Sequence, residues 1–171
     1  VGCDNIDLDQ LKERNLILCN TPDYGVDEVS DTAVAMILGL TRLIYRYDIK
    51  SKIINDGTWQ ENIFKEIRRS SEMKVGILGA GRIGGSVITK CKHLGFQTSF
   101  YDPFISRGMD KTYGSFRFDS IDDFISENDL ISINATQTES SFHLVDAEFI
   151  SKMKNESYLI NTARGKIIKD I

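Results

Sequence analysis

A glycine-rich stretch carries the strongest chemical signal in the sequence. Residues 75–87 read VGILGAGRIGGSV: an apolar run, then Gly79, Gly81 and Gly84, then a segment with helical character. In such a loop the first glycine permits a tight turn, the second lets the backbone approach a pyrophosphate, and the third lets the helix pack closely on the strand. The N–H groups and positive dipole end of the helix then face the phosphates. We expect a dinucleotide site; a glycine-rich turn without a ligand is the alternative.

An acidic residue at the end of the next apolar stretch indicates which dinucleotide would bind. Asp102 follows residues 96–101 and lies eighteen residues after Gly84. A carboxylate at this place accepts hydrogen bonds from the ribose hydroxyls of adenosine and repels a 2′-phosphate. We therefore expect NAD rather than NADP, although Arg107 lies only five residues further along the chain.

Alternating strands and helices would position this loop. The apolar stretches predict strands at residues 74–78, 96–101, 115–119, 129–134 and 158–162, with helices over 82–94, near 121–127 and near 146–153. Apolar strands that alternate with helices are typical of a parallel sheet covered on both faces. We expect a doubly wound, Rossmann-type α/β fold.

The residues before the glycine loop have a different organisation. Residues 16–19, LILC, predict a buried strand that the proline and glycine of NTPDYG end. From Val26 to Tyr47 apolar residues recur at steps of three and four, which predicts a long helix that residues 55–59 end. Such a helix would bridge two domains. Since the chain starts without methionine and stops within GKIIKDI, we expect a piece of a longer polypeptide.

Composition and charge exclude several classes of protein. The 171 residues are 41% hydrophobic and 27% charged, which is ordinary for a soluble globular protein. The net charge of −4 gives no general attraction for nucleic acid or anionic lipid. No signal peptide is visible, and no apolar run reaches the ~18 residues that a membrane span needs, so we expect neither secretion nor a membrane span. Three widely spaced cysteines argue against a four-cysteine zinc site and a disulfide scaffold, so we expect a cytoplasmic protein.

Several separated stretches, in order along essentially the whole chain, resemble one family, the D-isomer-specific 2-hydroxyacid dehydrogenases. This family includes phosphoglycerate dehydrogenase and the C-terminal-binding-protein corepressors. The stretches are VGCDNIDLDQLKERNLILCNTP, VSDTAVAMILGLTR, DGTW, VGILGAGRIGGSV with YDP, and INTARG. The resemblance implies that residues 1–22 are the C-terminal part of a substrate domain and that residues 23–171 are an NAD-binding domain, truncated at its C-terminal end. It also implies a homodimer built on the cofactor domains.

The truncation implied by the resemblance has a consequence for stability. The family has two more strands after the arginine motif, so a sheet cut at this point would expose an apolar edge. We therefore expect residues 1–171 alone to be poorly soluble or unstable.

The resemblance also assigns residues to the substrate. Val1 and Gly2 fall where backbone amides hold the substrate carboxylate, and Arg164 in NTARG falls where an arginine grips the carboxylate and the carbonyl oxygen. The predicted strand agrees with the second assignment, because Arg164 would emerge at its carboxyl end, where open α/β sheets bind ligands. A planar guanidinium can donate two parallel hydrogen bonds to a 2-keto acid. A surface arginine in a salt bridge is the alternative.

Four further residues are assigned to the cofactor by the resemblance. Arg82 and Ile83 would lie against the pyrophosphate, and Thr162 and Ala163 would line the cofactor site beside the arginine motif.

One stretch departs from the family pattern. Where the family has a motif similar to H-x-P-L on the adenine side, residues 134–137 read NATQ, which leaves the packing of the adenine open.

The proton donor for the reaction is expected elsewhere. The family uses a histidine held by a glutamate, downstream of the arginine motif and therefore beyond Ile171. His93 lies eleven residues after Arg82 on the same predicted helix, about 16 Å from the phosphate end at 1.5 Å per residue. His143 falls at a position that the family does not use for acid–base chemistry. We expect neither histidine to be catalytic.

The preferred function is that of an NAD-dependent enzyme that interconverts a 2-hydroxy acid and a 2-keto acid by hydride transfer. The alternative is a corepressor-like protein that senses NAD(H) and binds partners without significant turnover. An inactive paralogue or a related enzyme such as a formate dehydrogenase also stays open. The sequence does not identify the acid.

Overall fold

The strands form one parallel sheet with helices on both faces. The computed structural model describes residues 5–53, 64 and 67–169. Within these residues the sheet has five strands in the order β3-β2-β1-β4-β5, and every neighbouring pair is parallel. The strands are β1 (Lys74–Leu78), β2 (Gln97–Tyr101), β3 (Phe116–Phe118), β4 (Leu130–Ile133) and β5 (Tyr158–Asn161). The doubly wound, Rossmann-type α/β fold is therefore confirmed, and the five strands predicted between residues 74 and 162 are all present.

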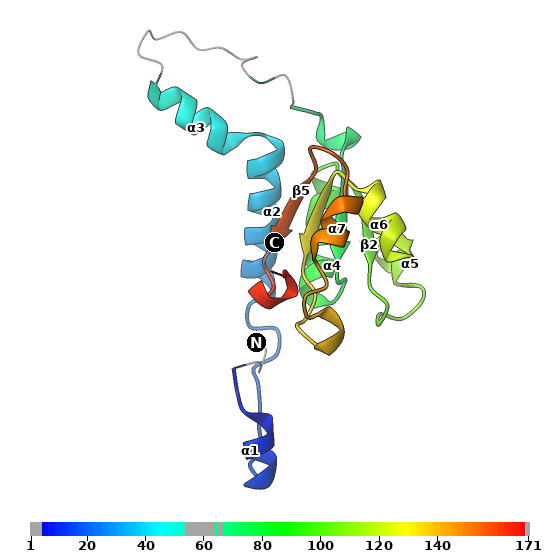
Figure 1. Ribbon diagram of the computed structural model, residues 1–171. Coiled ribbons are helices and arrows are strands. Elements are labelled where there is room, and N and C mark those ends of the chain that lie inside the picture. Colours follow the sequence, from blue (N-terminus) through cyan, green and yellow to red (C-terminus); the bar gives the residue numbers. More distant parts are fainter. Residues whose placement is uncertain (1–4, 54–63, 65–66, 170–171) are drawn as a thin grey trace.

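The α-helices are α1 (Leu8–Glu13), α2 (Val26–Thr41), α3 (Ile44–Ile53), α4 (Arg82–His93), α5 (Met109–Tyr113), α6 (Ile121–Glu127) and α7 (Ala147–Lys152). Helices α2 and α4 cover one face of the sheet and α6 and α7 the other, while α1 and α3 extend away from it (Figure 1). Three short 3-10 helices are η1 (Ser70–Glu72), η2 (Glu139–Ser141) and η3 (Gly165–Ile167). Helices α4, α6 and α7 lie where the sequence predicts them.

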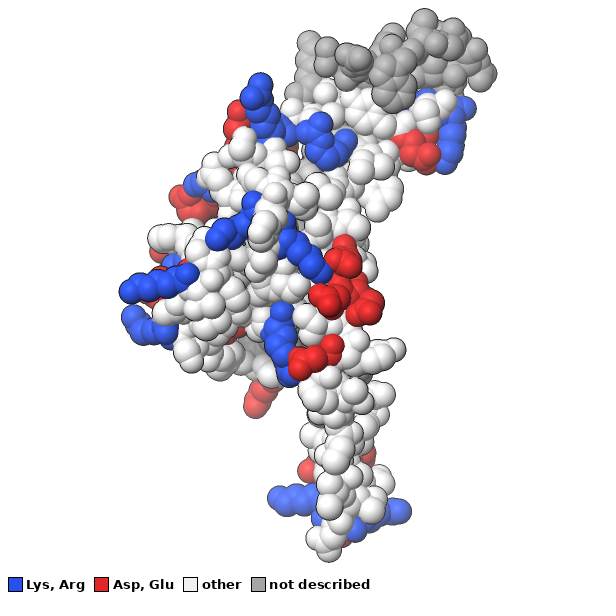
Figure 2. Space-filling view, turned by 180° about the vertical axis from the view of Figure 1, so that it is seen from behind, with Lys and Arg blue, Asp and Glu red and all other residues white. Residues whose placement is uncertain are grey.

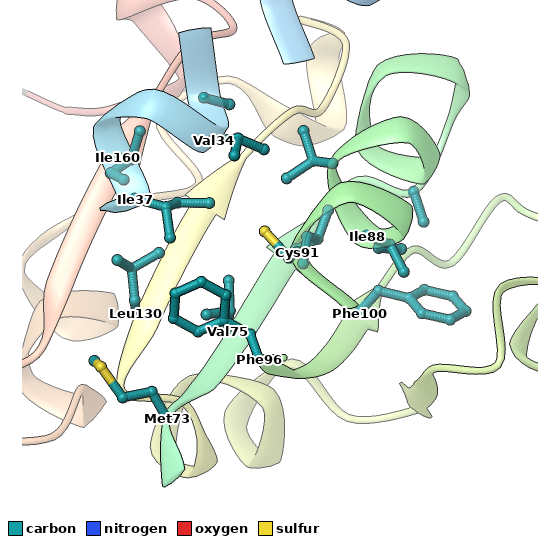
Figure 3. Packing of buried hydrophobic residues seen from close by; sticks show 14 residues of the cluster. Val34, Ile37, Met73, Val75, Ile88, Cys91, Phe96, Phe100, Leu130 and Ile160 are labelled. Atoms are coloured by element: carbon teal, nitrogen blue, oxygen red, sulfur yellow. The ribbon is translucent and has the colours of Figure 1, made fainter. Parts of the chain in front are cut away.

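Two hydrophobic clusters hold the layers together, one on each face of the sheet. Side chains at alternate positions of a strand point to opposite faces, so Val75 and Ile77 of β1 join one cluster and Leu78 joins the other. In the first cluster, side chains of α2 and α4 pack over the central strands, as Figure 3 shows for Val34, Ile37, Ile88 and Cys91. In the second, Phe124 of α6 and Phe149 of α7 pack on the opposite face. Burial on both faces keeps β1, which leads into the glycine loop, in a fixed place.

The predicted strand at residues 16–19 is wrong. These residues belong to no helix or strand, and within the described part of the chain no strand pairs with them. Leu16, Ile17 and Leu18 are exposed, Ile17 by 90%. An isolated strand is not stable in water, because its backbone groups and its apolar face both need a neighbour.

The predicted long helix from Val26 to Tyr47 is broken in two. Helix α2 ends at Thr41, and α3 begins at Ile44. Leu43 between them has a φ of +54° and a buried side chain, so the chain turns there to place leucine in the core. The ring of Tyr45 then lies against Gly39, where a Cβ atom would come within 2.7 Å of it. Residues 55–59, which were expected to end the helix, lie outside the described residues.

The surface carries both signs of charge. On the face shown in Figure 2, lysines and arginines are interspersed with aspartates and glutamates. Among the described residues, no helix is long and apolar enough to cross a membrane.

Asp129 stabilises the edge of the sheet opposite the glycine loop. Its Oδ2 accepts a hydrogen bond from the N–H of Lys74 at 2.9 Å. Its Oδ1 lies 3.1 Å from Nζ of Lys154 and 3.3 Å from Nη1 of Arg68. Burial raises the pKa of the Asp129 carboxyl, but the Lys74 N–H, Lys154 and Arg68 together outweigh burial and lower this pKa below its ordinary value.

We predict that Asp129→Asn lowers the free energy of unfolding by about 1 kcal/mol at pH 7, since it removes the charge from three hydrogen bonds. Because the folded-state pKa is the lower one, this stabilisation is present above about pH 4 and disappears as the pH falls through the folded-state value. Urea unfolding at pH 7 and near pH 3 would measure both effects.

Glu148→Gln is a matched control, because it neutralises an exposed carboxylate that pairs with Lys152 one helical turn away. It should cost no more than about 0.5 kcal/mol at pH 7. An Asp129→Asn penalty that is equally large at both pH values would contradict the assignment.

Candidate functional site

The candidate site lies at the edge of the sheet formed by the carboxyl ends of the strands. The strand order reverses between β1 and β4, and open α/β sheets bind ligands in the crevice at such a switch point. The loops after these two strands touch, since a Cβ atom on Gly79 would lie 2.6 Å from Cα of Ala135. The loop after β5 joins them through Thr162, whose hydroxyl donates to Oδ1 of Asn134 at 3.3 Å. The glycine loop and the arginine motif therefore share one edge.

The three glycines of the loop have three different structural roles. Gly79 has a φ of +88°, the left-handed conformation that glycine adopts without strain. At Gly84 a Cβ atom would lie 1.9 Å from the carbonyl oxygen of Gly79, so only glycine lets α4 approach the end of β1 so closely. At Gly81 a Cβ atom would have nothing within 4 Å, so this position faces open space.

The beginning of α4 suits an anion. Gly81 is the N-cap of this helix, and no side chain caps it with a hydrogen bond. The first N–H groups of an α-helix have no acceptor within the helix and carry the positive end of its dipole. A pyrophosphate that lies over Gly81 would accept from these groups, and a side chain at Gly81 would occupy its place. The geometry of the loop thus fits a dinucleotide.

The two residues that follow Gly81 point in different directions. Nη1 of Arg82 lies 2.8 Å from Oδ1 of Asp23, and both side chains are exposed. Ile83 is partly buried and packs against the first hydrophobic cluster. The backbone N–H of Ile83 stays in the first turn of α4, where a phosphate would meet it. Their expected contacts with the pyrophosphate remain predictions.

Asp102 connects the glycine loop with the loop after β2. Its Oδ2 accepts a hydrogen bond from the N–H of Ala80 at 2.9 Å. Its Oδ1 accepts from the N–H of Phe104 at 2.9 Å and from that of Ile105 at 3.2 Å. An ionised carboxylate offers about four acceptor positions, so these bonds leave room for a ribose hydroxyl. The carboxylate thus has a structural role that the sequence did not indicate, and its contact with a ribose stays a prediction.

Arg117 of β3 holds the backbone of the loop after β2, and this role was not expected from the sequence. Its guanidinium donates to the carbonyl oxygens of Asp102 at 3.1 Å, Ile105 at 3.2 Å and Ser106 at 3.3 Å. The signal was present, because an arginine within the apolar strand pattern SFRFD needs buried partners for its charge.

The arginine motif begins directly after β5. Asn161 shapes the turn: its Nδ2 donates to the carbonyl oxygen of Arg164 at 2.9 Å, and its Oδ1 accepts from the N–H of Ala163 at 2.9 Å. Arg164 is half-buried at the beginning of η3, and its Nη1 donates to the carbonyl oxygen of Ala163 at 3.1 Å. This role of Asn161 was not expected from the sequence, although asparagine commonly bonds to the backbone of a turn in this way.

His93 lies at the far end of α4 from the glycine loop, and His143 contacts the segment that follows the arginine motif. His93 ends α4, at the opposite end from Gly81, and its Nδ1 lies 2.7 Å from the carbonyl oxygen of Thr89. The ring of His143 stacks on Phe142 with 3.8 Å between the ring centroids, and the backbone N–H of His143 donates to the carbonyl oxygen of Lys166. Val1 and Gly2, which were assigned to the substrate, lie outside the described residues.

Comparisons with known proteins agree on one family. Residues 34–170 match the family described as D-isomer specific 2-hydroxyacid dehydrogenase, NAD binding domain. The crystal structure of a D-lactate dehydrogenase from Aquifex aeolicus, complexed with NAD and lactic acid, superimposes with a TM-score of 0.87 at 33% sequence identity. That likeness covers 98% of this chain and 49% of the dehydrogenase.

Two curated relatives have different names. The chain is 30% identical to a glyoxylate reductase of Thermofilum pendens over 98% of its own length, which is 50% of that protein. It is 31% identical to C-terminal-binding protein 1 of Caenorhabditis elegans over 99% of its own length, which is 24% of that protein. The chain thus spans half or less of the curated relatives that it matches.

We predict that Gly81→Ala weakens the binding of NADH at least about tenfold and changes the melting temperature by less than about 2 °C, because its methyl group fills only the space for phosphate. Gly84→Ala, in contrast, should lower the free energy of unfolding by about 2 kcal/mol or more, since its Cβ collides with the Gly79 carbonyl oxygen. Calorimetric titration and thermal unfolding would separate the two effects.

Gly25→Ala is a matched control for Gly81→Ala. Gly25 is also the N-cap of a helix without a side-chain cap, and a Cβ atom there would only reach van der Waals contact with Val29. NADH should bind this variant as it binds the wild type. If Gly81→Ala also binds NADH normally, the pyrophosphate does not lie over Gly81.

Proposed function

This chain belongs to the D-isomer specific 2-hydroxyacid dehydrogenases, and we propose that it serves an NAD-dependent enzyme that interconverts a 2-hydroxy acid and a 2-keto acid. One observation carries this proposal. The uncapped beginning of α4 and the arginine of the motif after β5 lie at the same edge of the sheet. A dinucleotide bound at α4 and a carboxylate substrate bound at Arg164 would therefore lie next to each other, as hydride transfer between them requires.

The chain's own groups hold the cofactor. The N–H groups in the first turn of α4 bind the pyrophosphate, Asp102 binds the adenosine ribose, and Thr162 and Ala163 line the site from the loop after β5. When it is bound, NADH supplies the hydride for reduction of the keto acid. The residues around it orient both molecules and lower the cost of bringing them together.

Arg164 binds the substrate in this proposal. Its guanidinium donates parallel hydrogen bonds to the carboxylate and the carbonyl oxygen of a 2-keto acid. The Asn161 side chain fixes the backbone on which Arg164 stands, through its bonds to residues 163 and 164. The positive charge beside the carbonyl oxygen also stabilises the negative charge that develops there as hydride is transferred.

The proton for that oxygen comes from outside residues 1–171 in this proposal. The position of His93 at the far end of α4 does not suit the reaction, and the family resemblance implies a histidine–glutamate pair after the arginine motif. A carboxylate beside a histidine raises its pKa and fixes its tautomer, which suits a general acid near neutral pH.

The proposal predicts that the full-length gene product oxidises NADH with at least one acid among glyoxylate, hydroxypyruvate and phosphohydroxypyruvate. Arg164→Lys should lower kcat/KM about 100-fold, because an ammonium group cannot donate the paired hydrogen bonds of a guanidinium. The Kd for NADH should stay within about twofold, since Arg164 contacts the substrate.

Lys166→Ala is the control for Arg164→Lys, because it removes an exposed cation two residues away and should leave kcat/KM unchanged.

Tight NADH binding without turnover on any 2-keto acid would favour the second candidate, a corepressor-like protein that senses NAD(H). The similarity to C-terminal-binding protein 1 is the observation in favour of that candidate.

A further prediction concerns the choice of cofactor. Asp102→Ala should reduce the preference for NADH over NADPH about 10-fold or more, because the charge that repels a 2′-phosphate is lost. The exposed carboxylate of Asp123 on α6 provides the control, and Asp123→Ala should leave the preference unchanged. An unchanged preference in Asp102→Ala would contradict the role of Asp102 at the ribose.

The proposal includes a second domain. We assign residues 1–22 to the end of a substrate domain and residues 23–171 to the cofactor domain. Helix α1 supports this division, because it has no buried residue and lies away from the sheet in Figure 1. The exposed apolar side chains of residues 16–18 also suit a contact with further protein.

We also propose that two copies associate through α2 and α3. Four large apolar side chains, Met36, Ile44, Tyr45 and Ile49, are exposed on these two helices, and a contiguous exposed apolar surface is typical of an interface. Sedimentation of the full-length protein as a monomer would contradict this proposal.

The cytoplasmic location stays a prediction.

A further inference from the structure

We propose that Tyr113, at the end of α5, is a positioning residue for the cofactor, because its hydroxyl orients the peptide group whose N–H faces the pyrophosphate. This inference rests on the binding of NAD at the glycine loop. It adds a residue that lies outside the glycine motif, twenty-nine residues after Gly84 along the chain.

The backbone on both sides of Ala80 is held by side chains. The hydroxyl of Tyr113 donates a hydrogen bond to the carbonyl oxygen of Ala80 at 2.9 Å. The carboxylate of Asp102 accepts one from the N–H of Ala80 at 2.9 Å. Two successive peptide groups, 79–80 and 80–81, are thus each fixed by one side chain.

The peptide group 80–81 connects Tyr113 with the phosphate site. In a planar trans peptide the C=O and the N–H point in opposite directions. The Ala80 carbonyl points to Tyr113, so the N–H of Gly81 points away from it. A Cβ atom on Gly81 would have no neighbour within 4 Å, so a ligand can approach the backbone at this residue. Without the hydrogen bond from the Tyr113 hydroxyl, the peptide group 80–81 would rotate more freely. Ordering this peptide group when NADH binds would then cost free energy and weaken the binding of NADH.

Tyr113 is itself held in place by its surroundings. Its ring stands edge-on to Phe100, with 5.8 Å between the centroids and 86° between the planes. Its backbone carbonyl accepts a hydrogen bond from Nζ of Lys92 at 2.6 Å. Gly114 ends α5 in the left-handed conformation, with a φ of +54°. Burial, and to a smaller degree the charge of Asp102, raise the pKa of the Tyr113 phenol, which therefore keeps its proton for the bond to Ala80.

Gly85 leaves the space that the tyrosine needs. A Cβ atom on Gly85 would lie 2.6 Å from Oη of Tyr113 and 2.9 Å from two of its ring carbons. Any larger residue at position 85 therefore displaces the tyrosine from Ala80. The glycine and the tyrosine form a matched pair, although Tyr113 lies twenty-eight residues after Gly85 along the chain.

The first test removes only the hydroxyl. Tyr113→Phe should raise the Kd for NADH about 3- to 10-fold, the range expected for one hydrogen bond, when titrated calorimetrically with NADH alone. Tyr158→Phe is the matched control, because Tyr158 is another half-buried tyrosine but begins β5 at the opposite edge of the sheet. The Kd of this control should equal that of the wild type.

A merely structural role gives a different result. If Tyr113 only fills the core, Tyr113→Phe lowers the melting temperature of the ligand-free protein and leaves the Kd unchanged, and this outcome would overturn the proposal. Wild-type protein that binds no NADH would instead overturn the proposed function, so the two failures are distinguishable.

The second test uses the matched pair. Gly85→Ala should raise the Kd for NADH in the wild-type background, because its methyl group pushes the phenol away from Ala80. In a Tyr113→Ala background the same Gly85→Ala change should have little further effect on the Kd, since no ring remains to be displaced. Additive effects on the Kd would show that the two residues act independently, which contradicts the proposal.

Discussion

The contact between Gly84 and the carbonyl oxygen of Gly79 is the constraint on which the site depends. It lets α4 begin directly at the end of β1, so close that a single Cβ atom would come within 1.9 Å of that oxygen. The free N–H groups of the first helical turn then lie at the switch point of the sheet. If α4 began further away, these groups would not reach a ligand held between the loops after β1 and β4.

The remaining parts of the site keep this arrangement rigid. Asp102 and Tyr113 hold the backbone on either side of Ala80, and Arg117 holds the loop that carries Asp102. At the same edge, the side chain of Asn161 shapes the turn before Arg164. The opposite edge, where Asp129 lies, contributes stability without touching the candidate site. Binding and stability can therefore be changed separately by mutation.

The sequence predicts the order of strands and helices well and the contacts between them poorly. Strands β1 to β5 and helix α4 follow from apolar runs and glycine spacing, which are local signals. The bond from Tyr113 to Ala80 joins residues from different elements, and no spacing rule reveals it. The strand expected at residues 16–19 fails for a similar reason, because a strand depends on a neighbour that no local pattern specifies. The break between α2 and α3 occurs at Leu43, which has a φ of +54° and a buried side chain. The apolar spacing along the chain continues through this position and does not reveal the break.

The most direct test of the account follows the backbone amides of the protein by NMR while NADH is added. The account predicts that the amide signals of Gly81, Arg82 and Ile83 shift most, since these groups meet the pyrophosphate. The amides of Lys74 and Asp129, at the other edge of the sheet, should keep their positions. If NADH binds and leaves the signals of residues 81–83 unchanged, the beginning of α4 is not the phosphate site and the account is wrong.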